Sequence, residues 1–153
     1  MSINEKIISL GLTLPTAAAP VAAYVPAVKS GNLVFTAGQL PVLDGKVVKE
    51  GKVGAEVSLE DAKALAQICA LNALAAIALV ADLDQIERVV RVGGFVNCSP
   101  GFVAIPAVVN GASEFLLKVF GEVNGKHART AVGVAELPLN APVEIELIVQ
   151  LKN

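Results

Sequence analysis

Charged side chains are scarce in this sequence of 153 residues: they make up 17% of it, whereas hydrophobic residues make up 54%. So few charges cannot cover the surface of a 15.7 kDa chain, and large exposed apolar patches usually mark interaction sites. The length fits one domain with a core that needs no disulfide or metal. We therefore expect a single domain, residues 1–153, that works as a symmetric oligomer.

Metal-binding and disulfide-forming residues are also few. The chain has one histidine, His127, and two cysteines, Cys69 and Cys98, without CxxC spacing. A structural zinc site needs four such ligands, so we expect no metal. Free thiols without a signal peptide favour a reducing, cytoplasmic setting. A catalytic role for His127 rests only on the general suitability of imidazole for proton transfer, and a solvated histidine beside a turn is more common.

An excess of positive charge is missing as well. The formal net charge of -2 gives no electrostatic basis for binding nucleic acid. The closest basic cluster, Lys46, Lys49 and Lys52, surrounds a predicted hairpin, where lysines usually form a solvated edge. Residues 64–81 carry no charge, but they are rich in alanine and include two amide side chains. We interpret them as a helix buried in a subunit interface and expect no membrane segment.

Local patterns predict the order of the elements. Capping boxes at Ser2 and Ser58 open two helices, Asp44-Gly45 between apolar pairs indicates a hairpin, and Gly93-Gly94 marks a bulge or a close approach. The predicted elements are a helix over 2–10, an extended connector over 14–27 that could hold an edge strand, β-rich residues over 32–40, a hairpin over 42–48, a helix over 58–79, a strand over 88–97, a helix over 105–121, and strands over 130–136 and 143–151. This order predicts an α+β fold: a mixed β-sheet with two long helices packed on one face. The uncovered face would need a partner.

The signatures of several enzyme classes are absent, including the GxSxG nucleophile elbow and a glycine-rich phosphate loop. The segment from Arg129 to Glu136 is more informative. Alternation puts Arg129, Ala131 and Gly133 on one face of a strand. The small side chains beside the guanidinium would leave space for a small carboxylate, which arginine can bind with two hydrogen bonds. Equally, the small residues could let a helix or a second subunit pack closely while Arg129 makes a surface ion pair.

The last predicted strand alternates apolar and acidic residues, and Glu144 and Glu146 share one face. Such a pattern usually means a solvent-facing edge. A glutamate near Arg129 could instead orient a water molecule or move a proton. We expect this strand to form a closing hairpin with residues 130–136, but a one-residue change of register would exchange its faces.

These motifs together resemble a known family. Residues 127–138 (HARTAVGVAELP) and 143–146 (VEIE) resemble the C-terminal signature of the reactive intermediate deaminase family, also called Rid or YjgF-like. A second match covers 24–26 (YVP) and 31–41 (GNLVFTAGQLP), and a weaker one lies in 109–115. The matches span most of the chain in the expected order.

The resemblance implies a chorismate-mutase-like α+β fold and a homotrimer with ligand clefts between subunits. It implies hydrolysis of reactive enamines and imines, such as the 2-aminoacrylate that pyridoxal-phosphate enzymes release, to 2-keto acids and ammonia, without a metal or organic cofactor. By position, Arg129 would hold the substrate carboxylate. Glu144 and the backbone carbonyl of Ala131 would position the attacking water. Tyr24 would line the cleft from a neighbouring subunit.

The sequence departs from the family pattern at two positions. Family members often carry serine where this chain has Ala37, and cysteine where it has Ala131. These departures indicate a divergent branch and leave three functions open: an imine or enamine deaminase, a non-catalytic binder of small carboxylated metabolites such as keto acids, and a structural or chaperone-like oligomer. Some members are described as endoribonucleases or translation inhibitors, and the charge balance argues against that role here.

Overall fold

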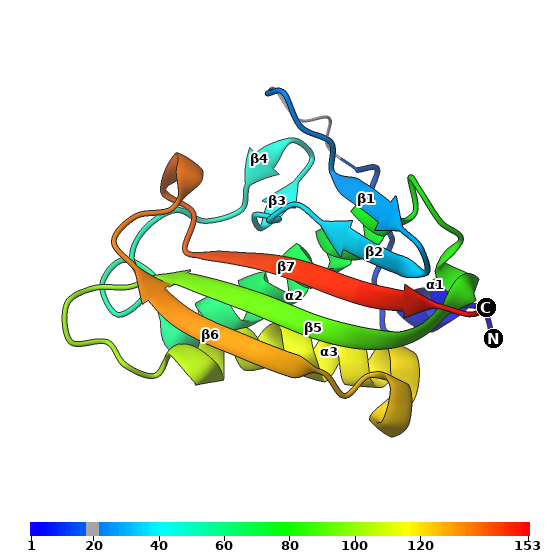
Figure 1. The fold of residues 1–153 in the computed structure, drawn as a ribbon. Coiled ribbons are helices and arrows are strands. Elements are labelled where there is room, and N and C mark those ends of the chain that lie inside the picture. The colour runs from blue at the N-terminus through cyan, green and yellow to red at the C-terminus, as the bar shows by residue number, and fades with distance from the viewer. Residues whose placement is uncertain (18–21) are drawn as a thin grey trace.

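The computed structural model describes residues 1–17 and 22–153 and shows a mixed five-stranded sheet with two long helices on one face (Figure 1). Pro20, in the expected connector, lies outside the described residues. The elements are α1 (Ile3–Ser9), β1 (Ala27–Ser30), β2 (Leu33–Thr36), β3 (Val42–Leu43), β4 (Lys46–Val47), α2 (Leu59–Ile77), β5 (Ile86–Asn97), α3 (Ile105–Asn124), β6 (Ala128–Val134) and β7 (Val143–Leu151), with short 3₁₀ turns at Leu83–Gln85 and Pro138–Asn140. The predicted α+β architecture is confirmed.

The strand order corrects one expectation. The order in the sheet is β1-β2-β7-β5-β6, so β5 lies between the two C-terminal strands and they do not form a hairpin. The chain leaves β5, passes through α3 and returns as β6 parallel to β5, as a βαβ crossover requires. β7 then pairs antiparallel with the other edge of β5. The expected closing hairpin was wrong because strands that follow each other in sequence were assumed to be neighbours in the sheet.

Both α1 and α2 begin, as predicted, at a serine whose side chain caps the helix. At α1 the box is complete: Ser2 Oγ accepts from the Glu5 amide at 3.1 Å, and Glu5 Oε2 accepts from the Ser2 amide at 2.7 Å. At α2 only half of it forms, because Ser58 Oγ accepts from the Asp61 amide while the Asp61 carboxylate binds Lys49 at 2.7 Å. Both helix starts were therefore correctly predicted, although the second capping box is not reciprocal.

Two hairpins form the N-terminal part of the sheet region. Asp44 and Gly45 have φ of 50° and 79°, the left-handed conformation of a two-residue primed turn, which confirms the predicted hairpin β3–β4. Gly31, with φ of 60°, turns the chain between β1 and β2, a hairpin that was not predicted. The edge strand expected within 14–27 begins only at Ala27, immediately after Pro26.

Helix α2 lies in the core of the chain itself. Its small side chains are fully buried between the sheet and α3: Ala62, Ala66, Cys69, Ala70 and Ala73. The interpretation of residues 64–81 as a subunit-interface helix was therefore wrong, since alanine lets this helix approach its own sheet closely. In the part of the chain that the structure describes, no helix is long and apolar enough to cross a membrane.

The paired glycines of β5 permit close approach from both faces. A Cβ at Gly94 would lie 2.5 Å from a Val109 methyl group on α3, and one at Gly93 would lie 2.7 Å from the Glu146 side chain on the other face. The expected close approach is thus confirmed. The irregularities in register occur earlier in β5, between Ile86 and Arg91, and not at the glycines.

The sheet face away from the helices is uncovered, as the sequence predicted. It exposes Val28 on β1 (51% exposed) and Phe35 on β2 (40%), which pair with each other, and the half-buried Ile148 of β7 pairs with Phe35. Val132 on β6 is also exposed. An apolar face of this kind is typical of a surface that a partner covers.

A substitution at Gly111 tests how closely α2 and α3 pack. A Cβ at this position would collide with the backbone carbonyl oxygen of Lys63, which cannot move as a flexible side chain can. We expect Gly111→Ala to lower the free energy of unfolding by about 1–3 kcal/mol, although alanine is the better helix former by about 1 kcal/mol. Urea denaturation at fixed protein concentration measures this, with the exposed Lys118→Ala as a control that should change it by less than about 0.5 kcal/mol. An unchanged or higher stability of Gly111→Ala would contradict the packing.

Candidate functional site

Arg129 stands on the face of the sheet that the helices cover. It lies opposite Val92 of β5, and Ala131 and Gly133 follow on the same side, opposite Gly94 and Val96. Side chains of paired residues share a face, so the predicted alternation of residues 129–133 is confirmed. The small residues allow α3 to approach this part of the sheet. The guanidinium therefore contacts a helix while the side chain stays half-buried.

Helix α3 holds the Arg129 guanidinium by one polar face. Nη1 donates to Asn110 Oδ1 at 2.8 Å and to Ser113 Oγ at 3.2 Å, and Nη2 lies 3.5 Å from the Pro106 carbonyl oxygen. Among the described residues, Nε and the second hydrogen of Nη2 have no acceptor. The fork is thus oriented by neutral groups and keeps an edge that can bind a carboxylate with two parallel hydrogen bonds. Within residues 1–17 and 22–153, Arg129 does not form the surface ion pair considered for it.

Neither Asn110 nor Ser113 was selected as a site residue from the sequence. The signal was available, because Pro106, Asn110 and Ser113 are spaced i, i+4 and i+7 and therefore share one face of a helix. The side chains of Asn110 and Ser113 are the polar groups on a face that otherwise packs with apolar residues. What could not be predicted was that this face meets β6, because the sequence does not fix the strand order.

His127 is also better connected than expected. Its Nδ1 lies 2.6 Å from the Gly125 carbonyl oxygen, which can only accept, so Nδ1 carries the proton. Its Nε2 lies 2.9 Å from Ser113 Oγ and therefore accepts the hydroxyl hydrogen. Burial lowers the pKa of His127, and the charge of Arg129 lowers it further against the opposing effect of the Gly125 bond. The expectation of a simply solvated histidine is wrong: the ring is half-buried and neutral.

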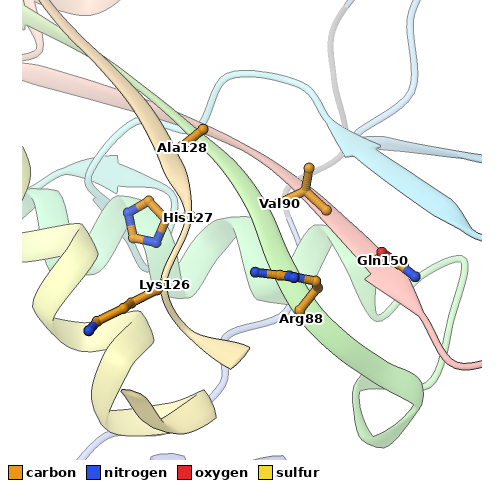
Figure 2. A pocket seen from close by; sticks show the side chains of 6 residues that line it. All are labelled: Arg88, Val90, Lys126, His127, Ala128 and Gln150. Carbon is orange, nitrogen blue, oxygen red and sulfur yellow. The ribbon is translucent and has the colours of Figure 1, made fainter. Parts of the chain in front are cut away.

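The same ring borders a shallow hollow of about 490 Å³ beside β5 and β6 (Figure 2). The hollow is lined by Arg88, Val90, Lys126, His127, Ala128 and Gln150. Arg88 and Gln150 pair across β5 and β7, so they project on the same side of the sheet. The titratable groups of the lining are all basic, which adds to the positive surroundings of His127.

Glu144 lies on the opposite face of the sheet. It pairs with Phe95, while its neighbours Val143 and Ile145 point into the core. The carboxylate rests directly against Gly38, where any side chain would collide with it. Burial raises the pKa of Glu144, and the nearby negative charge of Glu146 raises it further. A half-buried carboxylate with a raised pKa is suited to accept a proton near neutral pH.

Within one chain the structure does not bring the expected site residues together. Arg129 and Ala131 lie on the helix-covered face of the edge strand β6, whereas Glu144 lies on the uncovered face of β7, with β5 between them. Tyr24 precedes β1 at the far edge of the sheet and is 57% exposed. The chain thus carries two separate candidate half-sites, one around Arg129 and one around Glu144. No group of three or more potential metal ligands occurs among the described residues.

Comparison with known proteins places the chain among relatives of similar length. The sequence model described as "YjgF/chorismate_mutase-like, putative endoribonuclease" matches residues 4–151. Protein TCP17 of Trypanosoma cruzi is 46% identical over 145 residues, which cover 94% of this chain and 91% of that protein. The 2-iminobutanoate/2-iminopropanoate deaminase of Dermatophagoides farinae is 33% identical, with coverage of 92% and 95%.

A solved structure agrees with these relatives. The crystal structure of Atu1372 from Agrobacterium tumefaciens, a protein described as having unknown function, superposes with a TM-score of 0.89 at 45% identity, and it covers 98% of this chain and 92% of that one. The family match extends over nearly the whole chain, the fold is the same, and the quoted motifs lie on β2, β6 and β7 in the expected order. The chain belongs to the YjgF/Rid family.

Proposed function

We propose that this protein hydrolyses reactive enamine and imine intermediates of the 2-aminoacrylate type to 2-keto acids and ammonia. The observation that supports this most directly is the Arg129 guanidinium, which α3 orients while an edge of its fork stays available for a carboxylate. Relatives named 2-iminobutanoate/2-iminopropanoate deaminase, at 33% identity, support the reaction class.

The proposed site is divided between copies of the chain. Arg129 and Glu144 lie on opposite faces of one sheet, so no small substrate could contact both within a protomer. We propose a homotrimer in which Arg129 and the Ala131 carbonyl of one subunit face Glu144 and Tyr24 of its neighbour. The apolar uncovered face, with Phe35 and Val28 exposed, supports association of this kind.

The chemistry needs only water and proton transfers. An enamine first takes a proton on carbon and gives up one from nitrogen, which makes it the imine. Arg129 holds the substrate carboxylate, and water attacks the imine carbon, forming a C–O bond while Glu144 accepts a proton from the water. Glu144 returns that proton to nitrogen, which gives the carbinolamine. It then carries the remaining hydroxyl proton to the same nitrogen, so that the C=O bond forms, the C–N bond breaks, and ammonia and the keto acid remain. The raised pKa of Glu144 suits both directions of this transfer.

An endoribonuclease function has less support. Three lysines near the β3–β4 hairpin and α2 are paired with acidic side chains: Lys49 with Asp61 at 2.7 Å, Lys63 with Glu114 at 3.0 Å and Lys52 with Glu136 at 3.3 Å. Together with the net charge of -2, this pairing leaves little positive charge for phosphates. RNA cleavage by the purified protein that survives Arg129→Ala would favour this alternative.

Arg129 is the first residue to test. We expect Arg129→Ala to weaken binding of pyruvate by about 10²-fold or more and to abolish imine hydrolysis, because two charge-assisted hydrogen bonds are lost. Arg129→Lys should restore only part of the affinity, since a point charge replaces a planar fork. Calorimetry with pyruvate and ammonia release from imines generated in situ measure the two effects. If Arg129→Ala binds and turns over like the wild type, the site assignment is wrong.

Glu144 should affect turnover and not binding. Glu144→Gln keeps the shape but cannot accept a proton, so pyruvate should still bind while turnover falls by about 10²–10⁴-fold. In the wild type kcat/KM should fall on acidification at a higher pH than for an ordinary glutamate, since the base form is required and its pKa is raised. Glu146→Gln removes one cause of that raised pKa and should move this limb to lower pH. An acid limb that is unchanged in Glu146→Gln would contradict the assignment.

Mixing variants tests the division of the site. Arg129→Ala and Glu144→Gln chains, each inactive alone, should regain activity when they are unfolded together at equal amounts and refolded. In a ring with one site per interface, about one quarter of the sites then combine an intact Arg129 with an intact Glu144. Mixing Arg129→Ala with the double variant is the control and should give none. Light scattering that shows a monomer, or mixing without recovery, would contradict the proposed assembly.

A further inference from the structure

The environment of Arg129 contains a polar chain that the proposed reaction does not use. It runs from the Gly125 carbonyl through His127 and Ser113 to the guanidinium, with successive distances of 2.6, 2.9 and 3.2 Å. Each hydrogen bond in this chain has a defined donor and acceptor. The Gly125 oxygen fixes the proton on Nδ1, so Nε2 accepts the Ser113 hydroxyl hydrogen, and the Ser113 oxygen is left to accept from Arg129 Nη1.

The side chains of this hydrogen-bonded chain come from α3 and from the segment that forms β6. Ser113 belongs to α3, His127 precedes β6, and Arg129 lies on β6, so the chain joins the helix to the edge strand. A serine within a helix commonly donates its hydroxyl to the carbonyl oxygen four residues earlier. Here His127 takes that hydrogen instead, and this directs the serine lone pairs toward Arg129.

We infer that His127, acting through Ser113, is a positioning residue for Arg129 and that its protonation is linked to carboxylate binding at the guanidinium. This inference deepens the proposed function, on which it rests for the identity of the ligand. Nη1 is occupied by Asn110 and Ser113, so the remaining edge of the fork is presented in one orientation. A carboxylate arriving there finds the fork already oriented.

The charges around His127 give the direction of the linkage. Arg129 of β6 lowers its pKa, while Arg88 of β5 and Lys126, the adjacent residue, line the same hollow as the ring, and Glu122 of α3 lies 3.5 Å from Lys126 and offsets part of that charge. Gln150 of β7 contributes no charge. A carboxylate bound to Arg129 neutralises the cation that the chain connects to His127, so it must raise the pKa of His127. By reciprocity, protonated His127 strengthens carboxylate binding.

His127 is the single histidine of the sequence, so its imidazole resonances can be assigned without ambiguity. The experiment is an NMR titration of the imidazole between pH 4.5 and 8.5 (a range of about two pH units on each side of its ordinary pKa), with and without saturating pyruvate. We expect pyruvate to raise the pKa of His127 in the wild type. Arg129→Ala should raise this pKa without ligand, because it removes a neighbouring charge, and pyruvate should then have no further effect.

Binding of pyruvate to variants separates positioning from charge. Measured by calorimetry at pH 8, where His127 is neutral, His127→Ala and Ser113→Ala should each weaken binding by about 2- to 10-fold, the effect of losing one hydrogen bond. His127→Gln offers an amide oxygen to Ser113 and should restore most of the affinity. It has no titrating imidazole, so its affinity for pyruvate should rise less between pH 7 and pH 5 than we expect for the wild type.

Two results would overturn the inference: a His127 pKa that does not change when bound pyruvate is detected by calorimetry, or His127→Ala and Ser113→Ala variants that bind like the wild type. The outcomes are distinct from those of the proposed function. A wild type that shows the linkage but hydrolyses no imine disproves the deaminase and keeps the positioning chain. A wild type that hydrolyses imines, together with variants that bind pyruvate normally, supports the deaminase and disproves the positioning chain.

Discussion

Strand β5 hydrogen-bonds to β7 along one edge and to β6 along the other, and this double pairing places Arg129 and Glu144. Parallel pairing to β6 puts Arg129 on the side of Val92 and hence against α3. Antiparallel pairing to β7 puts Glu144 beside Phe95 on the other face. Because a strand's side chains alternate, shifting either register by one residue would exchange the two faces. The positions of both half-sites therefore depend on the register of one central strand.

Small residues make this arrangement physically possible. Gly94 admits Val109, Gly38 admits the Glu144 carboxylate, and Gly111 admits the backbone of Lys63. Helix α3 approaches Arg129 where small residues lie, and the segment after β2 lies against the Glu144 side chain. Protein interiors are packed like crystals, so an added methyl group must displace its neighbour. At Gly111 that neighbour is rigid backbone, whereas at Gly38 it is the end of a flexible side chain. The alanine-rich residues 64–81, which we first interpreted as a subunit-interface helix, mainly serve packing within the chain.

Local features were predictable from the sequence, and strand order was not. The helix starts at Ser2 and Ser58, the turn at Asp44-Gly45 and the alternation around Arg129 depend on short-range chemistry, and the structure confirms them. The hairpin expected between the last two strands failed because pairing is decided by packing across the whole sheet. The polar partners of Arg129 were missed for the same reason, since Asn110 becomes meaningful only once α3 is known to lie beside β6.

The two half-sites differ in how far a single chain prepares them. The guanidinium of Arg129 is already held by Asn110 and Ser113, and neutral groups hold it, so its charge remains available. Glu144 has its pKa raised by burial but faces an uncovered surface. Under the proposed function, a protomer would therefore orient the carboxylate but would not supply the base that acts on it. Under the proposed assembly, one subunit binds the substrate carboxylate, and hydrolysis needs Glu144 of a second subunit. Loss of the interface should therefore abolish turnover before it abolishes carboxylate binding.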